Sequence, residues 1–348
     1  MKRVIIIADW DADGCVSAAL ALYLLKTGQP PLSCWGGKEV EVRARPAGPR
    51  QAGSILSEVA KECPDGLLLL DIPLTDNVAA GLRRFSETCR GSEIIYVDHH
   101  PLTIERRALL EELAVKFAVQ GEAPTAQLLA EEASRRGAQV HEKLAKHVEA
   151  VKIMELGLRP PDERAGLVKF VASISRVLKL ERDEELWLRL VNWMTNPLPM
   201  PLGRAELEAL KRIEKEIGER DRELEEAAVN LALSAEKLAC LRFVDARKRW
   251  RRRGATSLAN RLSRILGAPV ALLTKIGESE ILVIKTRDGS AKLLGEKMIR
   301  ERLATDLGGH RNVAVARLAA GVDLQKLKRE LSRACVEIAL ERGKRSQS

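Results

Sequence analysis

Three short apolar runs that each close on an aspartate constrain the fold of this chain most strongly. They are RVIIIA at 3–8 with Asp9 following, LLLLD at 67–71, and EIIYVD at 93–98. Each run is too short for a buried helix but long enough for a buried strand. Helical patterns at 52–62 and 76–88 separate the runs, which favours a parallel sheet with helices on both faces. The aspartates should therefore meet at the carboxyl edge of the sheet, where such sheets bind ligands.

The length and hydropathy of the chain exclude several classes of protein. Its 348 residues, 45% of them hydrophobic, suffice for two domains that need no covalent staples. No apolar run approaches the ~20 residues that a bilayer crossing needs, so we exclude an integral membrane protein. The apolar run at the N-terminus is short and ends in aspartates, so we interpret it as a first strand rather than a signal peptide.

We expect an α/β protein in three parts. Residues 1–195 would form the parallel-sheet domain, and residues 239–348 a smaller α/β domain in which DLGGH at 306–310 makes a glycine turn. Between them, 196–238 opens with the prolines of NPLPMPLG and continues as a long, charge-alternating helix. Its apolar seam is thin, which favours a solvated connector over an oligomerising coiled coil. The oligomeric state stays open.

Acidic and imidazole side chains gather at the three expected strand ends. The set comprises Asp9, Asp11 and Asp13 of DWDADG, then Asp71, and then Asp98, His99 and His100 of DHHP. Clustered carboxylates repel one another and lose hydration, so their convergence implies a multivalent cation. Oxygen ligands mixed with imidazole suit Mn²⁺, and Mg²⁺ is less suited to histidine. Two such ions would activate a water and brace a phosphorus under attack.

Each motif also has a structural interpretation. An aspartate after a strand, such as Asp71, is most often the N-cap of the next helix, and a histidine pair at a strand end is often structural. The occurrence of all three motifs in this order favours a metal site.

These residues resemble a known family. DWDADG, the isolated Asp71 and DHHP look like motifs I, II and III of the DHH phosphoesterases, and DLGGH resembles the glycine-histidine motif of the DHH-associated C-terminal domain. The resemblance covers about residues 5–100 and 240–330. DWDADG is closer to the form of the RecJ exonuclease branch than to that of the nanoRNase and pyrophosphatase branches.

The resemblance implies roles for individual residues. Asp11, Asp13 and Asp71 would be metal ligands, with Asp71 as the bridge, and His99 would be a further ligand. His100 would be a ligand or proton donor near the scissile phosphate. Asp9 would be a ligand or support one, and Asp98 would orient a histidine ring.

The same resemblance implies a phosphate site in the second domain. Gly308 and Gly309 would bring backbone N–H groups close to a phosphate, and His310 would donate a hydrogen bond to it. Arg287, in the turn after ILVIKT, falls where family members place a phosphate-binding arginine.

The sequence departs from the family pattern in two places. The fourth motif, normally an aspartate expected near 150–165, has neither of its usual forms, although Glu155 or Asp162 could substitute. Loss of that ligand would weaken one metal site. Leu307 stands where related glycine loops carry a glycine, which narrows the expected phosphate loop.

A basic run at 247–253 contains six cations around Trp250 in a chain of net charge +9. Arg249, Trp250 and Arg251 would form a track for single-stranded nucleic acid, with the indole as a stacking platform. The alternative is a solvated charged loop. Its place beside the expected substrate domain favours nucleic acid.

The sequence predicts a cytoplasmic, Mn²⁺-dependent RecJ-like exonuclease that hydrolyses phosphodiester bonds of single-stranded DNA or RNA. One alternative is a catalytically weak replication scaffold that binds GINS and helicase, or other replication and repair proteins. Another is a nanoRNase or nucleoside-bisphosphate phosphatase acting on short oligonucleotides.

The remaining composition concerns the cellular setting. The six cysteines have no CxxC or zinc-type spacing, and we expect free thiols in a reducing compartment. Arg and Glu are abundant and Asn and Gln scarce, a bias that weakly indicates a thermophile.

Overall fold

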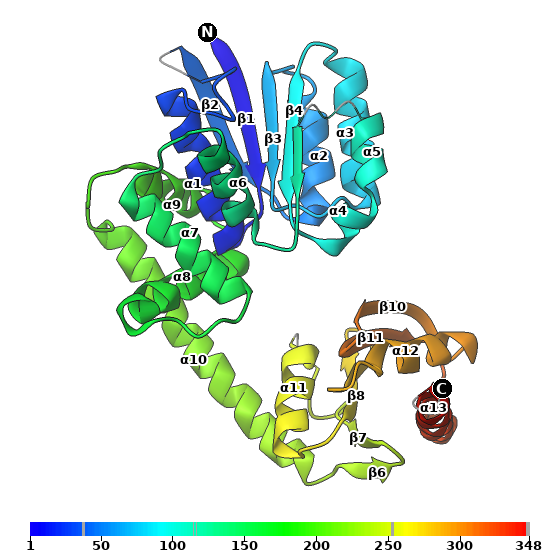
Figure 1. Cartoon of the computed structure of the whole chain (residues 1–348). Helices are drawn as coiled ribbons and strands as arrows, with labels where there is room; N and C mark the ends of the chain where they lie inside the picture. The colour runs from blue at the N-terminus through cyan, green and yellow to red at the C-terminus, as the bar shows by residue number, and fades with distance from the viewer. Residues whose placement is uncertain (37–38, 114, 116, 252–253, 346–348) are drawn as a thin grey trace. The chain divides into compact units, whose positions relative to one another are not determined.

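The chain folds into two compact units. The computed structural model describes residues 1–36, 39–113, 115, 117–251 and 254–345. Its contacts divide the chain into Met1–Glu214 and Lys215–Ser348 (Figure 1), and the division falls inside the long helix α10 (Arg204–Ala232). Within the ranges just given, no helix has both the length and the apolar character needed to cross a bilayer.

The first unit is built on a five-stranded sheet in the order β2-β1-β3-β4-β5, and every neighbouring pair is parallel. The strands are β1 (Lys2–Ala8), β2 (Val40–Pro46), β3 (Gly66–Leu70), β4 (Glu93–Asp98) and β5 (Phe117–Gln120). Three of them, β1, β3 and β4, are the aspartate-ended runs of the sequence, and they lie next to one another in the sheet. This confirms the predicted parallel α/β fold.

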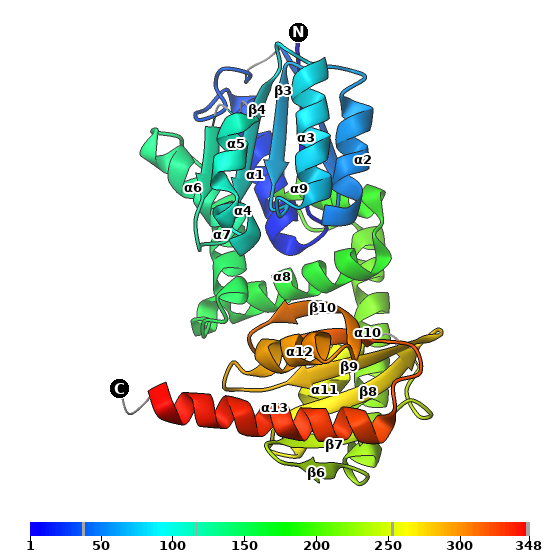
Figure 2. The ribbon, with the colours of Figure 1, turned by 90° about the vertical axis from the view of Figure 1, so that its right-hand side faces the viewer.

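Helices cover both faces of this sheet, as Figures 1 and 2 show. Helices α2, α3 and α5 pack on one face, while α1, α6 and α9 contact the strands from the other. The helices of the unit are α1 (Ala12–Thr27), α2 (Pro49–Val59), α3 (Asp76–Thr88), α4 (Pro101–Glu105), α5 (Arg107–Glu112), α6 (Thr125–Arg135), α7 (Glu142–Glu155), α8 (Asp162–Glu181) and α9 (Glu184–Thr195).

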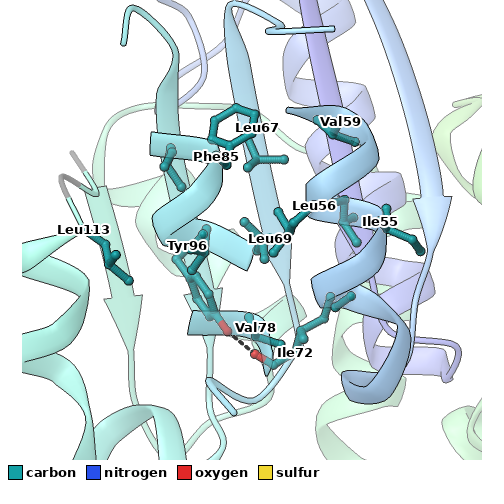
Figure 3. Packing of buried hydrophobic residues seen from close by; sticks show 14 of the residues in the cluster. Ile55, Leu56, Val59, Leu67, Leu69, Ile72, Val78, Phe85, Tyr96 and Leu113 are labelled. Atoms are coloured by element: carbon teal, nitrogen blue, oxygen red, sulfur yellow. Dashed lines mark hydrogen bonds between the residues drawn. The ribbon is translucent and has the colours of Figure 1, made fainter. Parts of the chain in front are cut away.

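A hydrophobic core under α2 and α3 holds the carboxyl ends of the strands in place. Leu69 of β3 and Phe85 of α3 are fully buried there (Figure 3). Burial of such a side chain contributes roughly 1.5–3 kcal/mol. The Tyr96 hydroxyl donates a hydrogen bond to the carbonyl of Ile72. This bond ties the loop that follows β3, and with it Asp71, to the neighbouring strand.

The second unit contains a six-stranded sheet in the order β10-β11-β9-β8-β7-β6, in which only β7 and β8 are parallel. Helix α11 and the end of α10 pack on one face, and α12 and α13 on the other. The elements are β6 (Glu236–Leu238), β7 (Leu241–Asp245), α11 (Ala255–Ile265), β8 (Val270–Ile276), β9 (Ser279–Lys285), α12 (Ala291–Arg300), β10 (Ala304–His310), β11 (Val313–Leu318) and α13 (Leu324–Arg345).

Two expectations about the chain are wrong. DLGGH is part of strand β10, paired with β11, rather than a glycine turn. Four of the six cysteines are not free thiols but form the disulfides Cys63–Cys89 in the first unit and Cys240–Cys335 in the second. Sequence spacing did not indicate these pairs, because residues 26 and 95 positions apart are brought together only by the tertiary fold.

Candidate metal centre

The aspartate-ended strands bring their acidic residues together by direct backbone pairing. The N–H of Asp9 donates to the carbonyl of Leu70 at 3.3 Å, and the N–H of Asp71 donates to that of Val97 at 3.0 Å. The ends of β1, β3 and β4 are therefore adjacent, and the side chains that follow them meet at one edge of the sheet.

The DWDADG loop turns sharply into helix α1. Asp11 caps this helix, because its Oδ1 accepts the N–H of Gly14 at 3.0 Å. A Cβ at Gly14 would lie 2.4 Å from the carbonyl oxygen of Asp9, so only glycine permits this close approach.

Asp13, in the first turn of α1, is held by the start of helix α6. Its two oxygens accept the N–H groups of Thr125 and Ala126, each at 2.8 Å. The first backbone N–H groups of a helix lack partners within it, and they favour a negative charge at this position.

Asp71 has an unusual backbone conformation. Its φ of 59° lies in the left-handed region, which costs of order 1–3 kcal/mol for a residue other than glycine. Its side chain is 2% exposed and accepts a hydrogen bond from the Thr125 hydroxyl at 3.2 Å. The N-cap of helix α3 is Thr75, so the interpretation of Asp71 as a helix cap is wrong.

The DHH motif places two imidazoles beside Asp71. His99 Nε2 lies 3.4 Å from Asp71 Oδ1 and 3.8 Å from Asp13 Oδ2. His100 Nδ1 lies 2.8 Å from Asp98 Oδ1, and the other oxygen of Asp98 accepts the hydroxyl of Thr103. Asp98 is fully buried, so its position fixes the orientation of the His100 ring.

The part of the chain that the structure describes contains two sets of potential metal-ligand atoms. Within each set, all the ligand atoms lie within 4.8 Å of one another. One contains Asp71, His99 and His100, and the other contains Asp9, Asp11 and Asp71. Asp71 belongs to both sets, as the resemblance implied for a bridging ligand. Asp13 belongs to neither set, although its Oδ2 lies 3.8 Å from His99 Nε2.

Burial and the charges of neighbouring carboxylates disfavour the ionised forms of Asp71 and Asp9. Burial, and then the charges of Asp13 and Asp11, raise the pKa of Asp71 well above its ordinary value. Burial and the charge of Asp11 raise the pKa of Asp9 to about 6. A divalent cation would remove this repulsion, and a set of carboxylate and imidazole donors fits Mn²⁺ or Mg²⁺.

The histidines differ in their electrostatics. Burial, aided by His100, lowers the pKa of His99, which favours the neutral form that binds metals. Burial also opposes protonation of His100, but the hydrogen bond and charge of Asp98 outweigh it and raise the pKa of His100.

Sequence reasoning did not identify Lys179 and Thr125 as parts of this centre. Lys179 Nζ lies 3.0 Å from Asp11 Oδ2. Glu155, the last residue of α7, interacts electrostatically with Asp11 and Lys179 but is in neither of the two sets above. No motif could have revealed Lys179 and Thr125, because they come from helices that are remote in sequence from the acidic motifs.

The candidate phosphate residues of the second unit gather at one end of its sheet. Gly308, Gly309 and Arg287 are exposed. Gly309 and Ile284 pair with the same residue of β11, Ala314, so Arg287 follows β9 near the β10–β11 connection. Gly309 has a φ of 110°, and a Cβ there would lie 2.2 Å from the Val313 carbonyl oxygen. The side chain of His310 lies outside the described part.

The described part of the basic run differs from the expected track at two residues. Arg247 pairs with Asp245 at 2.6 Å and with Glu280 at 2.9 Å. Trp250 is 7% exposed and belongs to a hydrophobic cluster with α11 and β8, so its ring has no open face for stacking, contrary to the prediction. Arg249 and Arg251 are exposed, and positions 252 and 253 lie outside the described residues.

Solved structures share this architecture. No protein-family model matches the sequence, and no curated protein does. The structure of RecJ with Mn²⁺ from Thermus thermophilus matches 97% of this chain at 18% identity and a TM-score of 0.57. A second structure, of exonuclease RecJ bound to manganese, matches 96% of this chain and 90% of its own length at 18% identity and a TM-score of 0.58. The chain has the RecJ-like DHH phosphoesterase fold.

Other comparisons show how widely this fold is used. The pGpG-specific phosphodiesterase PggH from Vibrio cholerae matches 97% of this chain and 99% of its own at 11% identity and a TM-score of 0.53. The chain spans about half of the Thermus RecJ, 52% of its length. At these identities the likeness establishes the RecJ-like DHH fold alone, so function must be argued from the site.

Proposed function

We propose that this chain is a metal-dependent phosphodiesterase that removes nucleotides from an end of single-stranded DNA or RNA, with Mn²⁺ as its preferred ion. The observation that carries the proposal is the pair of ligand sets that share Asp71 at the carboxyl edge of the sheet. Similar RecJ structures were solved with Mn²⁺ and with Mg²⁺, which supports a divalent ion, and the imidazole donor favours Mn²⁺. The bound ion would act as a Lewis acid and supply a water of lowered pKa.

The residues of the centre would divide the work. Asp71 and His99 would hold the ion, Asp9 would complete or support its ligand set, and His100 would stand beside the ion as a proton donor. Asp98 would fix the His100 ring and, by raising its pKa, keep a proton available for the departing oxygen. A His100 that serves in this way would lie beside the ion rather than bind it.

The second unit would bind the phosphate of the substrate. Exposed Gly308, Gly309 and Arg287 at one end of its sheet would supply the backbone N–H groups and the guanidinium that recognise a phosphate. Exposed Arg249 and Arg251 would add sequence-independent attraction to a nucleic-acid backbone.

A second candidate substrate is a dinucleotide. The burial of Trp250 and the ion pairs of Arg247 remove the stacking platform and one cation of the expected track, so an extended strand has fewer contacts. The similar PggH is a pGpG-specific phosphodiesterase.

The test compares substrates of different length. Labelled single-stranded DNA and RNA oligonucleotides, and the dinucleotide pGpG, are incubated with the protein and Mn²⁺, and released mononucleotides are quantified. We expect mononucleotides from the oligonucleotides and none without a divalent ion. Release from pGpG alone would favour the second candidate, and no product from any of the three would refute a phosphodiesterase and favour a scaffold. An Asp71→Asn preparation, purified in parallel, controls for contaminating nucleases.

A further inference from the structure

A lysine contacts the candidate metal centre directly. Lys179, on helix α8, places its ammonium 3.0 Å from Oδ2 of Asp11. The Lys179 side chain is 55% exposed, whereas that of Asp11 is 12% exposed. The charged end of Lys179 therefore turns inward to the carboxylates.

Helix α8 is held in register with the DWDADG loop. The hydroxyl oxygen of Ser175 accepts the N–H of Ala12, the residue after Asp11, at 3.4 Å. Ser175 and Lys179 are one turn apart on the same face of α8, since residues i and i+4 of a helix are neighbours. The contact that anchors Ser175 therefore also directs Lys179 to Asp11.

Both aspartates of the DAD segment are already engaged by the protein. Asp11 uses Oδ1 for the N–H of Gly14 and Oδ2 for Lys179. Asp13 uses its oxygens for the N–H groups at the start of α6. By contrast, the set of Asp71, His99 and His100 has no lysine or arginine within ion-pairing distance among the described residues.

We propose that the ammonium of Lys179 takes the place of a second divalent ion, so that the chain binds a single divalent ion at Asp71 and His99, beside His100. The inference rests on the proposed metal-dependent function. A lysine carries one permanent positive charge at neutral pH, and it compensates the set of Asp9, Asp11 and Asp71. An ion on the same oxygen of Asp11 would be repelled by the ammonium.

The stretch near 150–165 supports this interpretation. Glu155, one of the two candidate substitutes for the fourth-motif aspartate, interacts with Asp11, Lys179 and His100. It is in neither ligand set, and its negative charge partly offsets that of the lysine. In this interpretation, the ammonium of Lys179 replaces the second metal ion. The fourth-motif aspartate that would bind this ion is then not needed.

The test counts bound ions. Metal-free full-length protein is titrated with Mn²⁺ by calorimetry, and the bound metal is examined by electron paramagnetic resonance. We expect one ion per chain in the wild type, with the spectrum of an isolated Mn²⁺. In Lys179→Met, which keeps the length of the side chain but not its charge, we expect two ions and the spectrum of a coupled pair. Circular dichroism checks that each variant is folded.

Two further variants complete the experiment. Lys179→Arg keeps the charge and should bind one ion, and Lys169→Met, at an exposed lysine of the same helix, should also bind one. Two ions in the wild type, or one ion in Lys179→Met, would overturn the inference and leave the proposed function standing. No Mn²⁺ or Mg²⁺ bound by any variant would instead overturn the proposed function itself.

Discussion

At the scale of single residues, several independent constraints meet at Asp71. It is buried, shared by both ligand sets, and held in a left-handed backbone conformation. Such strain persists only where the surrounding structure enforces it, and it is concentrated at functional sites. Two adjacent strand ends and the hydroxyl of Thr125 provide that enforcement here.

Replacement of Asp71 tests separately its role in activity and its effect on the stability of the metal-free protein. Asp71→Asn keeps the size of the side chain and tolerates the left-handed conformation. We expect activity to fall by more than about 100-fold, beyond the loss typical of residues that only support a ligand. The metal-free protein should become more stable at neutral pH. A carboxyl group whose pKa is raised on folding lowers the stability of the folded state as the pH increases, and the amide removes this effect. Initial rates and thermal melts with and without Mn²⁺ measure both effects.

The control for this variant is Asp162→Asn, at an exposed residue in the first turn of α8 that is in neither ligand set, although the sequence suggested it as a substitute for the fourth motif. It should change neither the rate nor the shift in melting temperature that Mn²⁺ causes. Full activity in Asp71→Asn would refute its assignment as a shared ligand.

The pair of Asp98 and His100 predicts a pH dependence. The charge and hydrogen bond of Asp98 raise the pKa of His100 against the effect of burial. Asp98→Asn removes the charge, so the pKa of His100 should fall. If protonated His100 donates to the departing oxygen, the alkaline limb of the rate profile moves to lower pH and the maximal rate drops roughly 10–100-fold. A pH series of initial rates measures the change.

The matched control for the pH series is Asp76→Asn, at an exposed residue of the same unit. This variant should keep the wild-type profile. An alkaline limb that stays in place in Asp98→Asn would contradict the proposed role of His100 as a proton donor.

At the scale of elements, the centre depends on how helices start. The first turn of α1 is capped by Asp11, and the first N–H groups of α6 bind Asp13. Helix starts attract negative charge through unpaired N–H groups and the helix dipole. The two helices thus hold carboxylates in the centre that would otherwise repel one another.

Gly14 tests the packing at the start of α1. A methyl group there would meet backbone atoms of Asp9, so Gly14→Ala must displace the loop. We expect a loss of about 1–3 kcal/mol in the free energy of unfolding and a weaker stabilisation by Mn²⁺. Denaturant unfolding with and without the ion measures both.

The control at this scale is Gly166→Ala in helix α8, where a methyl group would meet nothing within 4 Å. Alanine is the better helix former, so stability should rise by about 0.5–1 kcal/mol. Wild-type stability in Gly14→Ala would show that the loop can relax without cost.

At the scale of the whole molecule, each unit contains its own disulfide. Closing loops of 26 and 95 residues restricts the unfolded chain, which corresponds to roughly 3.5 and 4.7 kcal/mol in the chain-entropy model. We expect reduction to lower the melting temperature, and non-reducing peptide mapping to recover the two pairs. Cys34→Ser, at an exposed free cysteine, should not change the response to reduction.

Peptide mapping of the oxidised protein that finds neither disulfide would contradict the structure.

The charge of the molecule is also distributed by the fold. The net charge of +9 and the basic run at 247–253 suggested a track for single-stranded nucleic acid. The structure keeps the acidic centre but commits part of the basic run to ion pairs and to the core. Arg249 and Arg251 of the run remain exposed.

The sequence by itself determined what depends on neighbours along the chain. Apolar runs that close on Asp9, Asp71 and Asp98 specified the strands, their parallel arrangement and the convergence of the acids, because strand period and length are local properties. Tertiary structure alone decided which partners the acids meet. Lys179, Thr125 and the cysteine pairs come from segments far apart, and the burial of Trp250 depends on packing against α11. Such contacts leave no local pattern, since they arise only when separate elements pack together.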